Sequence, residues 1–288
     1  MSTLALALVL AAALCHALWN YVLKKSGGGL GVLTLSAMLA AAMLTPFAIF
    51  LLVFEAFTFQ PVHLFIVIGS GLIHTAYFLL LDRAYRSGGD LSIVYPLARA
   101  TGPLITIAAA ALFLGERMSA VALGGALLVG VSAFLLTGNP AKFADQSARR
   151  SAGFALLTGA MIAAYTVWDK QAVAAFLIPP LLFDWCANLV RISILAPLTR
   201  LREPGAITGA WRTQRKAAFI IGFLSPLSYI LVLTAMVFTP VSYIAPAREI
   251  SILFAALLGT QLLNEGNATR RSIAAIGMVL GISALALG

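Results

Sequence analysis

The chain has 288 residues, of which 61% are apolar and only 10% are charged; its mean hydropathy is +0.99 and its net charge is +9. Soluble domains carry about 25% charged residues, so this composition excludes an ordinary soluble fold and favours a protein whose solvent is lipid. The basic residues lie in short clusters between apolar runs, as in the loops of membrane proteins, and no nucleic-acid-binding motif accompanies them. We therefore expect contact with a lipid bilayer and no nucleic-acid partner.

Ten apolar runs follow one another along the chain, each close to the length of about 20 residues that a spanning helix needs. In chain order they cover residues 3–23, 30–53, 62–81, 91–114, 118–137, 151–168, 178–199, 217–237, 240–263 and 270–287. The runs are continuous and lack the alternation of membrane β-strands, so a helix bundle is the fold that satisfies the backbone in lipid. The sequence predicts an all-α membrane protein with ten transmembrane helices.

The first five runs resemble the last five. Residues that correspond at an offset of 149 are, in pairs, His16 and Tyr165, Trp19 and Trp168, Asn20 and Asp169, Arg99 and Arg248, and Glu116 and Glu265. A repeat of five spans must insert its second copy upside down, and such inverted repeats build many secondary transporters around a site near the membrane midplane. We divide the chain into a repeat at 1–139, a linker at 140–150 and a second repeat at 151–288, around a central cavity.

Charged side chains within the runs are costly in lipid and therefore mark candidate functional positions. Five are found there: Arg99, Asp184, Arg191, Arg248 and Glu249. Arg99 and Arg248 each follow a proline expected to interrupt its helix, Pro96 and Pro246, and a guanidinium beside freed backbone groups can bind a carboxylate or phosphate. The alternative is that these arginines form structural ion pairs with the deep acids. Three deep arginines against two acids favour an anionic or zwitterionic ligand.

A polar stripe is predicted on the seventh run. Asp184, Asn188 and Arg191 are spaced at i, i+4 and i+7, which places them on one helix face that must avoid lipid. We expect this stripe and Glu249 to form a buried polar network, in which Asn188 bridges the acid and the arginine.

Aromatic and polar residues supply the remaining candidates for a substrate cavity. They are His74, Tyr77, Phe78, Tyr95, Trp19, Trp168 and Ser242, which we group with Arg99 and Arg248. Rings can stack on an aromatic substrate while an arginine holds its carboxylate. For the two tryptophans the alternative is an ordinary place at the membrane interface. Glu116 and Glu265 lie in tight connections, where we expect each to cap the helix that follows.

The first half carries a recognisable pattern. The segment from Ala84 to Ser92 leads into a helix containing Pro103, which ends in Leu114-Gly115-Glu116-Arg117 and is followed by Gly124-Gly125. This pattern resembles the repeat of EamA-type transporters of the drug/metabolite transporter superfamily. The second copy keeps Glu265 and lacks the arginine. The resemblance covers both halves and implies ten helices around a central cavity, alternating access and cytoplasmic termini. The Lys and Arg residues concentrate in loops opposite the termini, which instead favours termini outside the cytoplasm.

These features predict a multi-pass protein of the bacterial inner membrane that exports a small zwitterionic or anionic metabolite, with amino acids, aromatic ones included, as the favoured substrates. One alternative is a proton-coupled multidrug antiporter, although the first run offers His16 and Asn20 where such proteins use a carboxylate. Another is a carrier of phosphate esters or nucleotide sugars, which would suit the arginines but lacks a late lysine pair. We expect a monomer or weak dimer.

Enzymatic chemistry finds no support in the sequence. The chain has three histidines and no HExxH or GxSxG motif. Cys15 and Cys186 lie inside apolar runs, where cysteine is usually a small buried residue. We expect no catalytic residues, no metal and no cofactor.

Overall fold

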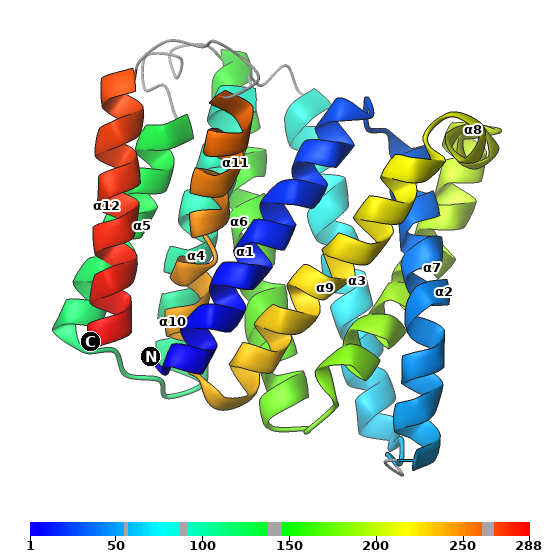
Figure 1. Cartoon of the computed structure of the whole chain (residues 1–288), viewed down its shortest axis with the longest axis horizontal. Coiled ribbons are helices and arrows are strands. Elements are labelled where there is room, and N and C mark those ends of the chain that lie inside the picture. Colours follow the sequence, from blue (N-terminus) through cyan, green and yellow to red (C-terminus); the bar gives the residue numbers. More distant parts are fainter. Residues whose placement is uncertain (55–56, 87–90, 138–145, 261–267) are drawn as a thin grey trace.

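The computed structural model of the chain describes residues 1–54, 57–86, 91–137, 146–260 and 268–288, and these residues form twelve helices and no strand (Figure 1). The helices are α1 (Thr3–Lys25), α2 (Leu30–Phe54), α3 (Pro61–Arg86), α4 (Leu91–Phe113), α5 (Ala120–Thr137), α6 (Gln146–Ala174), α7 (Pro180–Arg202), α8 (Ala206–Thr213), α9 (Arg215–Phe238), α10 (Val241–Ala247), α11 (Ile250–Thr260) and α12 (Ala268–Leu287).

Within the described ranges, five helices are long and apolar enough to cross a membrane, by length and composition: α1, α2, α6 over Ala152–Ala174, α7 and α9. Shorter apolar stretches of ten to seventeen residues occur in α3, α4, α5 and α12. Large apolar side chains such as Phe54, Leu112 and Phe113 point outward, each more than 70% exposed. An exposed apolar surface of this kind fits lipid. The prediction of an all-α membrane protein is confirmed at this level.

The two prolines expected to interrupt helices behave differently. The ninth run is broken after Pro246 as expected, because α10 ends at Ala247 and α11 begins at Ile250. Pro246 has no backbone N–H, and the Glu249 N–H turns back to the Pro246 carbonyl three residues away, which tightens the chain and ends α10. By contrast, the interruption expected at Pro96 was wrong, because α4 continues through this residue as one helix. Helix α8 was not predicted, since its eight residues lie in a polar stretch.

Glycines let several of the helices approach closely. A Cβ atom on Gly125 of α5 would lie 2.6 Å from the Gly281 carbonyl oxygen of α12, so these two backbones are in direct contact. On α3, Gly69 faces the Trp168 ring of α6 and Gly71 faces Val190 of α7. Helix α3 is thereby held between α6 and α7, which positions the polar residues one turn further along it.

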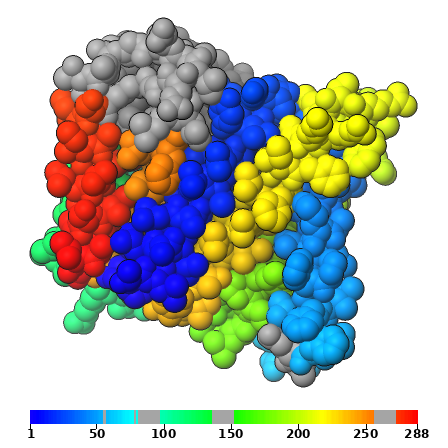
Figure 2. All heavy atoms as spheres, viewed as in Figure 1, coloured from blue at the N-terminus to red at the C-terminus, as the bar shows by residue number. Residues whose placement is uncertain are grey.

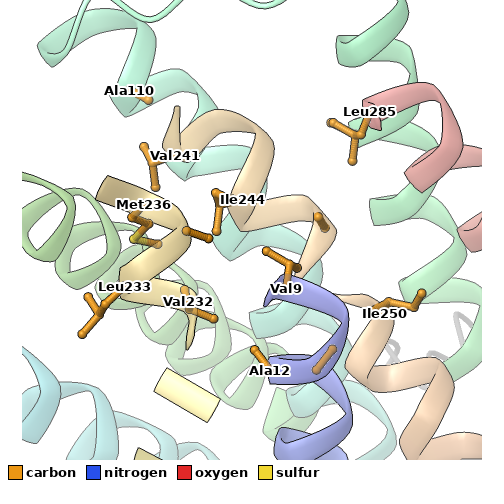
Figure 3. Packing of buried hydrophobic residues seen from close by; sticks show 14 of the residues in the cluster. Val9, Ala12, Ala110, Val232, Leu233, Met236, Val241, Ile244, Ile250 and Leu285 are labelled. Carbon is orange, nitrogen blue, oxygen red and sulfur yellow. The ribbon is translucent and has the colours of Figure 1, made fainter. Parts of the chain in front are cut away.

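Apolar side chains fill the space between α1, α9 and α10. Figure 3 shows Val9 and Ala12 of α1 beside Val232 and Met236 of α9 and Ile244 of α10, all of them buried. The two termini lie at the same end of the bundle, where the Met1 amino group donates to the Ala286 carbonyl at 3.1 Å (Figure 1). Helix α8 lies at the opposite end.

Candidate functional site

A buried carboxylate joins three helices inside the bundle. Asp169 of α6 has no exposed side-chain surface, and its Oδ2 lies 2.9 Å from Nε2 of His74 on α3. The Tyr229 hydroxyl of α9 donates to the same oxygen. Among the described residues, the Asp169 Oδ1 atom has no hydrogen-bond partner. One half of the chain supplies the histidine and the other supplies the acid and the phenol.

Aromatic rings surround this carboxylate. The His74 ring stacks on Tyr165 with centroids 4.1 Å apart and an interplanar angle of 24°. Tyr77 and Tyr229 approach these rings edge-on, at 5.8 Å from Tyr165 and 5.5 Å from His74. We call His74, Tyr77, Tyr165, Asp169 and Tyr229 the central cluster. A ligand with a flat ring could stack here in the manner of these side chains.

The central cluster lies deep along its helices. His74 and Tyr229 are each about 20 Å from the first residue of α3 and α9, given the rise of about 1.5 Å per residue. The His74 side chain nevertheless keeps 15% of its surface exposed. Polar groups at such depth are costly in lipid and are usually retained for function.

The two equivalent arginines have different surroundings. Arg99 of α4 forms an ion pair with Glu249, with Nε and Oε2 3.1 Å apart, and donates from Nη2 to the Ser251 hydroxyl at 2.8 Å. Arg248 lies at the break between α10 and α11, with its guanidinium 5.6 Å from the Tyr229 ring centroid. Within the described part of the chain, the Arg248 guanidinium has no hydrogen bond or ion pair. Arg99 therefore fits the structural alternative, and Arg248 borders the central cluster.

The stripe on α7 forms its own network beside α2. Arg191 donates from Nε and Nη2 to the side-chain Oδ1 of Asn188, and the Asn188 side-chain amide donates to the Ala37 backbone carbonyl at 2.9 Å. Asp184 and Asn188 are buried. Among the described residues, Asn188 makes no bond to Asp184, so the expected bridge is absent; its oxygen accepts from Arg191 and its amide group donates to the α2 backbone. Glu249 belongs to the Arg99 pair instead of this network.

Other predicted positions have structural surroundings. The Trp168 indole donates to the Ile66 carbonyl at 2.8 Å and packs on Gly69, so it fastens α6 to α3. Trp19 packs against an apolar cluster near α8, with its ring 5.1 Å from His16. Ser242 is buried. The side chains of Phe78 and Tyr95 lie outside the described residues, as do Glu265 and most of the linker.

Glu116 caps a helix, but not the expected one. Its two carboxylate oxygens accept the backbone N–H groups of Val241 and Ser242, each at 2.9 Å. The capped helix is α10, not the following α5. A carboxylate at a helix N-terminus satisfies free N–H groups and complements the helix dipole. Glu116 thus ties the connection between α4 and α5 to the broken helix that carries Arg248.

Tyr165, Asp169 and Tyr229 were missing from the predicted site. Asp169 was placed just beyond the run 151–168, but α6 continues to Ala174 and draws the acid inside. Tyr165 was visible as the repeat counterpart of His16, whereas Tyr229 had no distinguishing signal.

Within the described residues, no group of three or more His, Cys, Asp or Glu side chains could hold a metal ion.

Comparison with known proteins supports the fold alone. No family model matches the chain, and no curated protein matches it. A solved crystal structure of a protein superposes on it with a TM-score of 0.76 over 98% of both chains, at 16% sequence identity. At this identity, the match establishes a shared helical architecture and says nothing of activity.

Proposed function

We propose that the protein is a secondary transporter of a small metabolite, of the EamA type, in the bacterial inner membrane. The observation that carries this proposal is the central cluster. A buried Asp169, partnered by His74 and Tyr229 from two other helices and ringed by tyrosines, would be a costly way to stabilise a bundle in lipid. A site that must bind and release a polar solute at this depth would need such groups.

The helix pairings support an arrangement of ten spans in two inverted repeats. The offset of 149 relates α1, α2, α3 and α5 to α6, α7, α9 and α12, and α4 to the broken pair α10 and α11. When each helix is exchanged for its repeat counterpart, a packed pair of helices becomes another packed pair. The contact between α1 and α9 corresponds to that between α6 and α3, and the contact between α2 and α9 to that between α7 and α3. The contact between α4 and α6 likewise corresponds to that between α11 and α1. The pairs α5–α12 and α2–α7 each map onto themselves, as helices beside a two-fold axis do.

Zwitterionic aromatic metabolites, above all amino acids, are the substrates that best fit these residues. Arg248 lies at a helix break beside the cluster without an anionic partner among the described residues, and a guanidinium cannot lose its proton to escape burial. A substrate carboxylate would supply the missing anion. The rings of Tyr77, Tyr165 and Tyr229 would face an aromatic side chain.

One observation favours a second candidate, export of hydrophobic cations coupled to protons. Asp169 is a fully buried carboxylate, one oxygen of which has no partner in the part of the chain that the structure describes, and a group of this type can bind a cation or a proton in such antiporters. The two candidates differ in which charged residue meets the substrate, Arg248 or Asp169.

Counterflow in liposomes tests the proposal. Vesicles containing the purified protein and unlabelled phenylalanine should accumulate labelled phenylalanine transiently. The Arg248→Gln variant should not accumulate it. The Arg99→Lys variant should still be present in the membrane at wild-type abundance. A hydrophobic cation is run in parallel. Counterflow of the cation but of no amino acid would replace the first candidate by the second, and counterflow of neither, or of phosphate esters alone, would reject both.

A further inference from the structure

A basic pocket lies at the end of the bundle opposite the termini, far from the central cluster. Its volume is about 570 Å³, and it opens between the C-terminal turns of α1 and the corner where α8 meets α9. In Figure 2 these segments meet at the upper edge of the visible face. The pocket involves none of the residues assigned to transport.

Among the described residues, this pocket is lined by four cations and by no acid; the cations are Lys25, Arg212, Arg215 and Lys216. Arg212 and Lys25 lie in the last turns of their helices, where a cation is stabilised by the helix dipole. Arg215 and Lys216 instead occupy the first turn of α9, where the dipole is repulsive to a cation and attractive to an anion. That turn has no acidic residue and no side-chain cap. A bound anion would offset the repulsion among all four charges.

The walls of the pocket are held in place. The Gln214 amide donates to the Ser26 carbonyl at 2.5 Å, which links the α8–α9 corner to the end of α1. At the base of α8, the Ala206 backbone lies against Gly31 of α2 so closely that no Cβ would fit. The backbone segments that carry the cations are therefore joined to one another.

The position and lining of the pocket identify the kind of anion. Val22, Ala217 and Ile220 give it an apolar wall continuous with the spanning helices α1 and α9. Exposed Trp211 packs near Phe219 beside it, and exposed tryptophans are enriched at the level of lipid headgroups. A charged opening above an apolar wall, at the end of two spans, matches a phosphate joined to acyl chains.

We propose that this pocket binds the headgroup phosphate of an anionic phospholipid, with Lys25, Arg212, Arg215 and Lys216 around the phosphate and the acyl chain along Ile220. The ligand of this site is a lipid, and it is distinct from the transported substrate. The site also predicts that this end of the bundle faces the anionic surface of the bilayer.

Native mass spectrometry of the purified full chain tests the site. Detergent-solubilised protein is titrated with phosphatidylglycerol and, separately, with phosphatidylcholine. The pocket variant carries Arg212→Gln, Arg215→Gln and Lys216→Gln. The control variant carries Lys24→Gln, Arg200→Gln and Arg202→Gln, which removes three basic charges that do not line the pocket. Thermal unfolding of each variant without lipid checks that it is folded.

We expect the wild type and the control variant to retain phosphatidylglycerol over phosphatidylcholine, and the pocket variant to bind phosphatidylglycerol roughly tenfold or more weakly. Equal weakening in both variants would show diffuse surface attraction and overturn the proposal. Inorganic phosphate is titrated against the free protein and against protein loaded with phosphatidylglycerol. If phosphate displaces phosphatidylglycerol at equal concentration, or stabilises the free protein when the lipid does not, the site belongs to a soluble phosphate instead.

Discussion

Asp169 illustrates how a single residue can organise a site inside a membrane protein. An isolated ionised carboxylate is strongly disfavoured away from water, so its charge must be compensated by partners. His74 and the Tyr229 hydroxyl meet the same oxygen, and the second oxygen is buried with no hydrogen-bond partner among the described residues. The acid therefore couples α3, α6 and α9, and a ligand or proton that engages the second oxygen would act on all three helices.

Replacing this acid should impair transport more than it impairs folding. We expect Asp169→Asn to lower the initial counterflow rate by roughly tenfold or more, because an amide loses the charge-assisted bonds to His74 and Tyr229. Asp184→Asn is the matched control, since it also converts a buried acid to an amide but lies outside the central cluster. Similar rates for both variants and the wild type, at equal abundance, would remove Asp169 from the mechanism.

Arg248 permits a sharper test of substrate charge. Arg248→Lys keeps the charge and loses the planar pair of donors, so we expect a raised half-saturating concentration for phenylalanine with the protein still folded. Arg99→Lys should mainly lower the thermal unfolding midpoint, because Arg99 is paired with Glu249 and Ser251. The two effects are separated by measuring transport and unfolding on each variant. Identical behaviour of the two variants would contradict the different roles assigned to the arginines.

How far the site could be predicted depends on the range of the interactions involved. His74, Tyr77 and Arg248 were identifiable because a polar or charged residue within an apolar run is conspicuous by itself. Tyr229 was not, because a tyrosine in a run is ordinary until α9 is placed against α3 and α6. The different environments of Arg99 and Arg248 were also invisible, since repeat symmetry makes them equivalent and only the packing of Glu249 distinguishes them.

Among the elements, the broken helix α10–α11 depends on a contact from the other half of the chain. Its first turn begins after Pro240, and the carboxylate of Glu116 binds the N–H groups of Val241 and Ser242. Its end at Ala247 follows from Pro246. A helix of seven residues is too short to be stable alone, so this cap and the surrounding packing must hold it in place.

Removal of the cap should destabilise the fold measurably. We expect Glu116→Ala to cost about 1–2 kcal/mol, because two backbone N–H groups lose a charged acceptor. Arg117→Ala, one residue along the same connection and exposed, should leave stability nearly unchanged. Thermal unfolding in detergent measures both. An unchanged midpoint for Glu116→Ala would mean that water replaces the carboxylate without loss.

Alanine substitutions at two neighbouring glycines of α5 should change the stability of the fold in opposite directions. Gly125→Ala places a methyl group 2.6 Å from the Gly281 carbonyl, and we expect the overpacking to cost about 1–3 kcal/mol. Gly124→Ala meets no atom within 4 Å and should stabilise the helix by about 0.5–1 kcal/mol. Unfolding midpoints of the two variants relative to the wild type decide this, and shifts of the same sign would contradict the close α5–α12 contact.

For the whole molecule, the apolar runs predicted most helix boundaries because lipid imposes a length and a composition on every span. The apolar runs could not predict α8, because its position comes from the packing of Ala206 on Gly31. They also could not predict which helices become neighbours.

The two ends of the resulting bundle carry different groups. The termini meet at one, and the basic residues of α8, of the start of α9 and of the end of α1 gather at the other.

This asymmetry predicts the orientation of the chain in the membrane. Spanning proteins place their basic loops in the cytoplasm, so we expect the α8 end to be cytoplasmic and both termini to lie outside, contrary to the implication of the EamA resemblance. In a background with Cys15→Ala and Cys186→Ala, single cysteines are introduced as Ser2→Cys and Thr213→Cys. A membrane-impermeant maleimide added to intact cells should label Ser2→Cys alone, and permeabilisation should expose Thr213→Cys. The reverse pattern would place the termini in the cytoplasm and the basic pocket on the outer face, where its lipid partner would have to come from the outer leaflet.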